Sequence, residues 1–229
     1  MTLVYLHGFT GQGGGWPGAI APHLPGHAHR PIPAHYSLWQ AADDLAAELP
    51  DTFDLLGYSL GARLALHLAI AHPQRVNRLV LIGAATHVPD PQARVVEDEV
   101  WAHMLETEGL ETFYRNWDAR PIFSSRQRQT HPDHDPLALA QALRAFSPGR
   151  QDDLRGRLAE IDAPTLWLAG EHDPKFVRLA HESAPACRRG QAATVPGCGH
   201  DVPLERPEAL ARLLTDFLSA AAPVPEEAP

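Results

Sequence analysis

The chain has 229 residues, the size of one ordinary domain. Its 44% hydrophobic and 21% charged residues supply enough apolar side chains for a buried core and exclude a chain that is disordered throughout. The 19 basic and 28 acidic residues give a net charge of −9, which argues against a nucleic acid or an anionic membrane surface as the main partner.

The cysteine content and the N-terminal residues indicate a reducing compartment. Cys187 and Cys198 are too few for a disulfide scaffold. Residues 1–7 have neither the basic region nor the cleavage site of a signal peptide, and no apolar run approaches the roughly 20 residues that span a bilayer. We therefore expect a soluble, cytoplasmic protein with no membrane partner.

The predicted elements alternate between short apolar runs and longer amphipathic segments, a pattern typical of a parallel sheet with helices on both faces. The predicted strands are Leu3–Leu6, Ala19–Ala21, Phe53–Leu56, Leu79–Ile82, Thr165–Ala169 and Ala192–Val195. The segments with apolar residues at helical spacing are Ser37–Leu49, Leu60–Ala71 and Pro207–Ala220. The sequence therefore predicts an α/β fold with a mostly parallel sheet of about six strands.

The alternation is interrupted between about residues 86 and 161. This stretch contains helix-like pieces and no convincing strand: Val95–Glu106, Leu110–Trp117, Pro136–Phe146 and Leu154–Glu160. Its position between two strands predicts a helical lid, and the alternative is an insertion that only pads the sheet. We expect residues 1–85 and 162–220 to form the core, residues 86–161 the lid, and residues 221–229 a disordered tail.

A G-x-S-x-G motif, with Ser59 between Gly57 and Gly61, follows one predicted strand and opens the helix Leu60–Ala71. In this context it predicts a tight strand-to-helix turn that exposes the serine hydroxyl at the top of the sheet. The alternative is a serine that only caps the helix. We favour the turn because a cap does not need the flanking glycines.

A serine hydroxyl becomes a useful base or nucleophile only when a histidine takes its proton and an acid holds that histidine. The chain order Ser, acid, His is typical of this kind of turn. Asp173 and His200 each follow a predicted strand, so Ser59, Asp173 and His200 are the predicted catalytic triad. Glu171 is the weaker candidate for the acid, and ordinary loop residues are the alternative for both positions.

Backbone N–H groups after the first strand and at the start of the apolar helix are positioned to form an oxyanion hole, and we assign it to Phe9 and Leu60. The His-rich segment His131–Asp135 favours a solvated loop over a metal site because Pro132 interrupts it and the spacing is irregular. No metal and no cofactor are predicted.

Two basic residues lie close to the predicted triad in sequence. Arg63 is one helical turn past Ser59, and a cation buried near a helix N-terminus needs an anion to compensate it. An acidic side chain and a substrate carboxylate are equally open as that anion. Lys175 is the single lysine of the chain, which suggests that a compact ammonium is wanted there.

These motifs resemble the α/β-hydrolase superfamily along nearly the whole chain, through His7-Gly8-Phe9, Leu24-Pro25-Gly26-His27, the turn at Ser59, and Gly199-His200. Within it, further segments resemble the menaquinone-biosynthesis synthases usually called MenH: Tyr58–Arg63, Trp117–Phe123, Leu143-Arg144, Gly149–Gln151 and Asp173–Phe176. The resemblance implies an α/β-hydrolase fold with a helical lid.

The resemblance also implies a cofactor-free lyase that forms 2-succinyl-6-hydroxy-2,4-cyclohexadiene-1-carboxylate by expelling pyruvate. The triad would abstract a proton next to a carbonyl, and the oxyanion hole would hold the enolate. The implied partner is a small substrate that bears carboxylates. Its expected contacts are Tyr58, Arg63, Arg94, Trp117, Arg144 and Lys175. Four other arginines of the lid are expected to face solvent: Arg115, Arg120, Arg126 and Arg128.

The chain also departs from the family pattern. Ala62 replaces a glycine after the turn, Arg120 replaces a glutamine in the lid, and Pro203 replaces a second histidine. These differences bear on the substrate more than on the triad. Two alternatives stay open: a serine carboxylesterase or other small-molecule hydrolase, and a binding protein without catalysis on the same scaffold. The sequence does not predict the oligomeric state.

Overall fold

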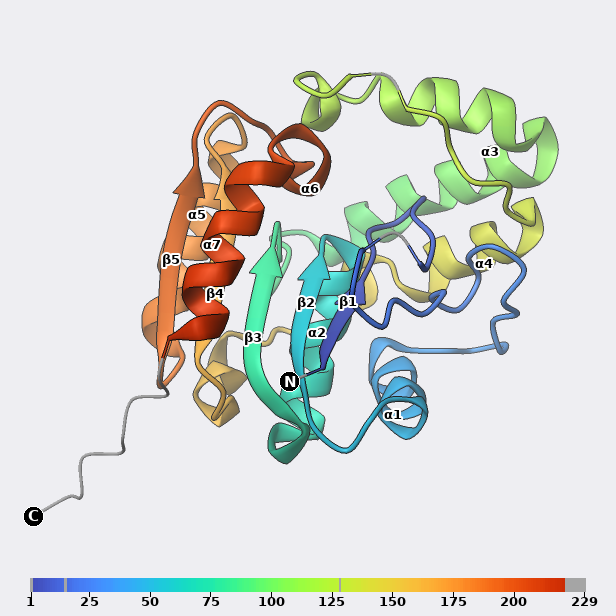
Figure 1. The fold of residues 1–229 in the computed structure, drawn as a ribbon. Coiled ribbons are helices and arrows are strands. Elements are labelled where there is room, and N and C mark those ends of the chain that lie inside the picture. The colour runs from blue at the N-terminus through green and yellow to red at the C-terminus, as the bar shows by residue number, and fades with distance from the viewer. Residues whose placement is uncertain (1, 15, 128, 221–229) are drawn as a thin grey trace, which may run out of the picture.

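The computed structural model describes residues 2–14, 16–127 and 129–220. The predicted tail, residues 221–229, lies outside the described residues. Figure 1 shows a twisted sheet with helices on both faces and a helical insertion beyond the carboxyl ends of the strands. In the described part of the chain, no helix is both long enough and apolar enough to cross a bilayer.

The sheet consists of five parallel strands that lie side by side in sequence order. They are β1 (Leu3–Leu6), β2 (Phe53–Tyr58), β3 (Val76–Ile82), β4 (Thr165–Gly170) and β5 (Gly190–Val195). The predicted α/β fold is confirmed. The strand predicted at Ala19–Ala21 is wrong: only Ile20 pairs with β1, through a single bridge to Val4. Pro22 has no N–H to extend that pairing.

The helices cover the two faces of the sheet unequally. Parallel strands in sequence order with right-handed connections place the connecting helices on one face. That face carries α1 (Leu38–Glu48), α2 (Leu60–Ala71) and α5 (Pro174–Ser183). The helix after the last strand, α7 (Pro207–Ser219), covers the other face with Leu210, Leu214 and Phe217 (Figure 1). Its predecessor α6 (Val202–Glu205) is one turn long.

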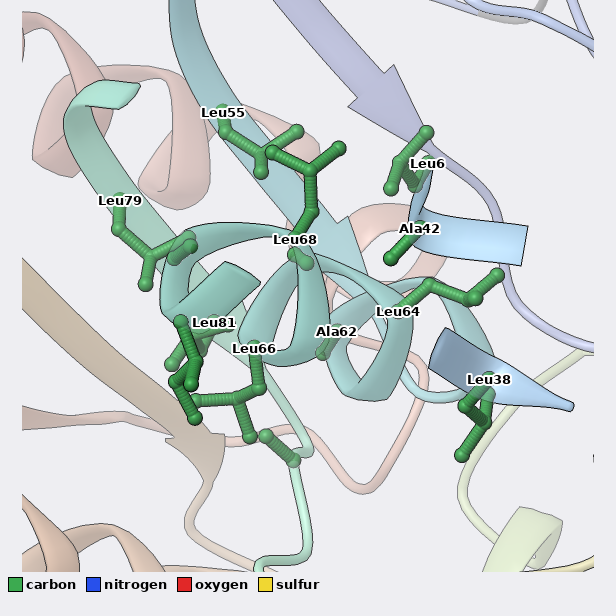
Figure 2. Packing of buried hydrophobic residues seen from close by; sticks show 14 of the residues in the cluster. Leu6, Leu38, Ala42, Leu55, Ala62, Leu64, Leu66, Leu68, Leu79 and Leu81 are labelled. Carbon is green, nitrogen blue, oxygen red and sulfur yellow. The ribbon is translucent and has the colours of Figure 1, made fainter. Parts of the chain in front are cut away.

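Helix α2 is apolar nearly all round because it is enclosed between the sheet and α1. Leu64, Leu66 and Leu68 are fully buried. Figure 2 shows them between Leu55 and Leu79 of the sheet and, on the other side, residues of α1. Each buried leucine contributes about 1.5–3 kcal/mol. This packing fixes the helix whose first turn follows Ser59.

The insertion between β3 and β4 contains α3 (Pro91–Asp118) and α4 (Pro136–Ala145). Gly109 interrupts α3 with a φ of 77°, so the two predicted helical pieces on either side of it are confirmed. The predicted helix at Leu154–Glu160 is a short 3-10 helix. The 3-10 helices of the chain are Pro73–Arg75, Pro121–Phe123, Pro148–Arg150, Arg155–Glu160 and Ala184–Ala186.

The two ends of the insertion are tied to each other. The Leu154 N–H donates a hydrogen bond of 2.9 Å to the Thr86 carbonyl. The insertion also has a small core of its own, in which Phe113, Trp117 and Leu139 are buried. The division of the chain into a core and a lid at residues 86–161 remains a prediction.

Candidate active site

Ser59 occupies a strained turn between β2 and α2. Its φ of 52° and ψ of −109° lie outside the regions that a side-chain-bearing residue normally adopts, at a cost of about 1–3 kcal/mol. Its neighbours must be glycine because a β-carbon on Gly61 would stand 2.0 Å from the Leu6 carbonyl oxygen, and one on Gly57 would stand 2.4 Å from the Gly61 carbonyl oxygen. Ser59 makes no side-chain cap to the helix, which rules out the capping alternative.

The three predicted triad residues meet at the carboxyl ends of the strands. The His200 Nε2 atom is 3.1 Å from the Ser59 Oγ atom, and His200 Nδ1 is 2.7 Å from Asp173 Oδ2. A proton on Nδ1 donates to the carboxylate, so Nε2 is free to accept the serine proton. Glu171, the rival acid, is exposed and accepts a hydrogen bond from the Gly197 N–H instead.

Asp173 and His200 are both buried, and each has a further contact besides their mutual hydrogen bond. Asp173 is the N-cap of α5 and accepts a hydrogen bond from the Phe176 N–H. The Phe176 ring lies 4.6 Å from the His200 ring, between centroids. Since both side chains are shielded from water, the ion pair that forms when His200 accepts a proton is stronger than it would be in solution.

The predicted oxyanion-hole residues, Phe9 and Leu60, line the same cavity as Ser59. Neither backbone N–H has a hydrogen-bond acceptor in the described part of the chain. Leu60 is the first residue of α2, where backbone donors lack intrahelical acceptors. The loop that carries Phe9 is held by His7, which accepts a hydrogen bond from the Leu24 N–H at 3.1 Å. These two donors therefore face the site unoccupied.

The cavity is about 160 Å³ in volume and is rich in cations. Besides Ser59 and His200 it is lined by four basic side chains: Arg63, Arg94, Arg120 and Lys175. A cavity of about this volume holds a ring as small as benzene. The sequence predicted three of these cations, but it assigned Arg120 to solvent.

Arg63 is buried without an acidic partner among residues 2–14, 16–127 and 129–220. Its guanidinium donates to the Phe146 carbonyl at 2.7 Å and to Gln151 Oε1 at 3.4 Å. Burial, together with the nearby positive charge of Arg94, lowers the pKa of Arg63 to about 9. Of the two anions that the sequence left open, the structure does not provide the acidic side chain.

Arg94 and Arg120 belong to the insertion and are partly neutralised by it. Arg94 donates to both carboxylate oxygens of Asp98, at 2.7 and 2.9 Å. Arg120 donates to Glu97 at 3.2 Å, and its guanidinium carbon lies 4.3 Å from the centre of the Trp117 ring. Burial, and next Arg94, lower the pKa of Arg120.

Lys175 reaches the cavity from the first turn of α5 and keeps some exposure to solvent. The surrounding protein, and next the charge of Arg94, lower the pKa of its ammonium. In the described residues no acidic side chain forms an ion pair with it. Arg63 and Lys175 thus lie beside Ser59 and His200 without an ion-pair partner among the described residues.

The other residues predicted to contact the substrate do not all line this cavity. Arg144 lies outside the cavity because Glu99 and Glu106 of α3 hold its guanidinium. Trp117 lines the cavity, whereas Tyr58 lines a second, neighbouring one.

Two residues expected to be solvated are held inside the protein. The Arg126 side chain is buried between Asp118 and Asp201. In the loop predicted around His131, Asp133 and Asp135 are exposed, whereas His131 stacks on Tyr114 with ring centres 3.9 Å apart and His134 is buried. Arg115 is exposed as predicted, and Arg128 lies outside the described residues.

Comparisons with known proteins bear on this site. A model of the alpha/beta hydrolase family matches residues 3–213. A 2-succinyl-6-hydroxy-2,4-cyclohexadiene-1-carboxylate synthase of Enterobacter sp. (strain 638) is 33% identical, with 94% of this chain and 91% of the relative covered. The synthase of the same name from Salmonella arizonae is 31% identical, with 94% and 93% covered. The solved structure of MenH from S. aureus superposes with a TM-score of 0.87 at 26% identity, with 95% and 93% covered. The resemblance predicted from the sequence is confirmed.

Proposed function

This chain belongs to the alpha/beta hydrolase family and, within it, to the 2-succinyl-6-hydroxy-2,4-cyclohexadiene-1-carboxylate synthases, and we propose that it catalyses their reaction. It acts as a cofactor-free lyase that eliminates pyruvate from an enolpyruvyl precursor in menaquinone biosynthesis. One observation carries the proposal: the Ser59–His200–Asp173 relay opens into a cavity where the buried cation Arg63 lacks an acidic partner. The cytoplasmic location predicted from the sequence is part of this proposal.

The relay abstracts a proton from the substrate. His200 Nε2 accepts the Ser59 hydroxyl proton while Ser59 Oγ takes a proton from the carbon next to a substrate carbonyl. The electron pair of the broken C–H bond moves onto the carbonyl oxygen, where the N–H groups of Phe9 and Leu60 stabilise the enolate. When the enolate collapses, a C=C bond forms and the C–O bond to the enolpyruvyl group breaks. The leaving group regains a proton and becomes pyruvate.

The cations of the cavity bind the substrate carboxylates. Arg63 and Lys175 form no ion pair with a described acidic side chain, so they gain most when a carboxylate enters. Arg94 and Arg120 add positive potential from the insertion. We propose that the insertion acts as a lid, because it supplies these arginines and the Trp117 wall to a site otherwise built on the sheet.

The assay is pyruvate release from the enolpyruvyl precursor by the purified protein, with Ser59→Ala as the blank. We expect turnover by the unaltered protein and a loss of nearly all of it in Ser59→Ala. If the unaltered protein releases no more pyruvate than Ser59→Ala, the proposed lyase activity is rejected. In that case a rapid burst of p-nitrophenol from short p-nitrophenyl esters would identify a carboxylesterase with the same three residues. If neither activity is found, a binding protein without catalysis is the alternative that remains.

A further inference from the structure

A second cavity, of about 460 Å³, meets the cation-lined one at the nucleophile. Ser59 and Phe9 line both cavities, as do Trp117 and Phe123 of the insertion. The larger cavity extends from Ser59 to Tyr5 of β1 and to Trp16 in the loop that follows. The proposed proton relay and carboxylate pocket do not use this space.

The larger cavity contains no uncompensated charge among its described lining residues. Its cation is Arg126, which forms ion pairs with Asp118 and, at 3.1 Å, with Asp201. Gln129 donates a further hydrogen bond of 3.1 Å to the Asp201 carboxylate. His7, which also lines the cavity, stays neutral because burial lowers its pKa to about 4. A carboxylate would therefore find no free cation here, in contrast to the smaller cavity.

Two tyrosines that line this cavity have hydroxyl groups available as hydrogen-bond donors. Tyr5 and Tyr58 are each 8% exposed, and neither hydroxyl forms a hydrogen bond with any residue that the structure describes. Burial raises the pKa of both phenols, so they remain protonated donors. The Trp16 ring lies 5.0 Å from the Tyr5 ring and forms an aromatic wall beside that hydroxyl.

We infer that the larger cavity is a second binding site, which takes an uncharged ligand with a ring and a hydrogen-bond-accepting oxygen, such as an aryl ketone. A ring fits with room for substituents, because about 150 Å³ already accommodates benzene. The ring packs against Trp16, and its oxygen accepts a hydrogen bond from Tyr5. The site does not depend on the proposed lyase reaction, because it rests on the walls of the cavity alone.

Binding of acetophenone and of benzoate tests this site, because the two probes share a ring and differ in charge. Titration followed by ligand-observed NMR gives the affinity of each. We expect Tyr5→Phe and Trp16→Ala each to weaken acetophenone binding at least about fivefold, the effect of one lost hydrogen bond or ring contact. Neither variant changes benzoate binding. Arg63→Ala has the opposite pattern, since it weakens benzoate and leaves acetophenone unchanged.

Trp39→Ala is the matched control, because Trp39 lies outside both cavities and donates to Asp152 at 2.7 Å. It should bind acetophenone as the unaltered protein does. Tyr5→Phe removes a single oxygen atom and should fold normally, so it still tests the site if Trp16→Ala does not fold. The site is overturned if acetophenone fails to bind, if both variants bind it normally, or if Arg63→Ala abolishes its binding. The titration contains no enolpyruvyl precursor, so its outcome is separate from that of the pyruvate assay.

Discussion

Gly83 lies directly against the imidazole of His200. A β-carbon on Gly83 would stand 2.7 Å from the Cε1 atom of His200 and 3.1 Å from its Nδ1 atom. Gly83 follows β3 in a left-handed conformation with a φ of 61°, which L side chains rarely adopt. The missing side chain is what allows the ring to stand within hydrogen-bonding distance of Ser59.

We predict that Gly83→Ala lowers kcat about 100-fold, because the added methyl group displaces the imidazole and a misplacement of about 1 Å has effects of this size. The measurement is the steady-state rate of pyruvate release, with circular dichroism to check that the variant folds. Gly156→Ala is the control, since a β-carbon there meets no atom within 4 Å. Equal rates in the two variants would disprove the role of this contact.

Arg63→Ala should raise KM for the enolpyruvyl substrate about 10- to 100-fold, the range expected when a charged hydrogen bond to a carboxylate is lost. Hydrolysis of a neutral ester should change little. Arg144→Ala is the matched comparison, because Glu99 and Glu106 hold that guanidinium outside the cavity. We expect the KM of Arg144→Ala to stay near that of the unaltered protein. A rise in KM as large as that of Arg63→Ala would show that Arg144 also binds the substrate.

Lys175, together with Arg63, whose pKa burial lowers to about 9, should set the alkaline limit of substrate binding. The pKa of Lys175 lies below the ordinary 10.5 because of burial and the neighbouring Arg94. The protonated form binds carboxylates, so kcat/KM falls as the pH rises through this lowered pKa. We expect Lys175→Arg to move the part of the fall that is due to Lys175 to higher pH, since a guanidinium loses its proton at a higher pH than an ammonium in the same surroundings. A profile of kcat/KM from pH 7 to about 10.5 measures this. If the alkaline fall of kcat/KM is unchanged in Lys175→Arg, the fall is due to another group.

His7 should make the fold sensitive to acid. Burial lowers its pKa from 6.5 to about 4 in the folded chain, so the unfolded chain binds the proton more tightly. This contribution to stability is complete above pH 6.5 and is lost as the pH falls toward 4, a difference of about 3 kcal/mol. In His7→Gln the free energy of unfolding, measured in urea, should fall less over this interval. An equal fall in both proteins would contradict the assignment.

Arg126→Met should destabilise the protein by about 3 kcal/mol, because it leaves the buried Asp201 carboxylate without its cation. Asp201 follows His200 directly, so we also expect kcat to fall. Thermal and urea unfolding measure the first effect. Arg155→Ala is the control, because its ion pair with Asp153 is exposed and such pairs contribute little to stability.

Local signals in the sequence were sufficient to predict that Ser59, Asp173 and His200 lie together. The glycines around Ser59 are required by contacts within the same turn, and the positions of Asp173 and His200 after strands place them at one edge of a parallel sheet. The insertion offered no comparable signal. Whether Arg120 or Arg144 faces the cavity depends on how α3 packs against α4, and that packing is set by contacts distant in sequence.

The strand wrongly predicted at Ala19–Ala21 also depends on pairing outside the local segment. A short apolar run forms a strand only if its neighbours also supply backbone donors, and Pro22 does not. The larger cavity was also invisible in the sequence, because its walls come from segments as far apart as Tyr5 and Asp201.

The hydrogen bond between Leu154 and Thr86 closes the insertion at its base. A segment whose two ends meet can be replaced by a longer or shorter one without stretching the strands on either side, and loop length itself adds little entropic cost. Replacement of this segment would therefore exchange the cations Arg94 and Arg120 while Ser59 and His200 keep their places at the end of the sheet.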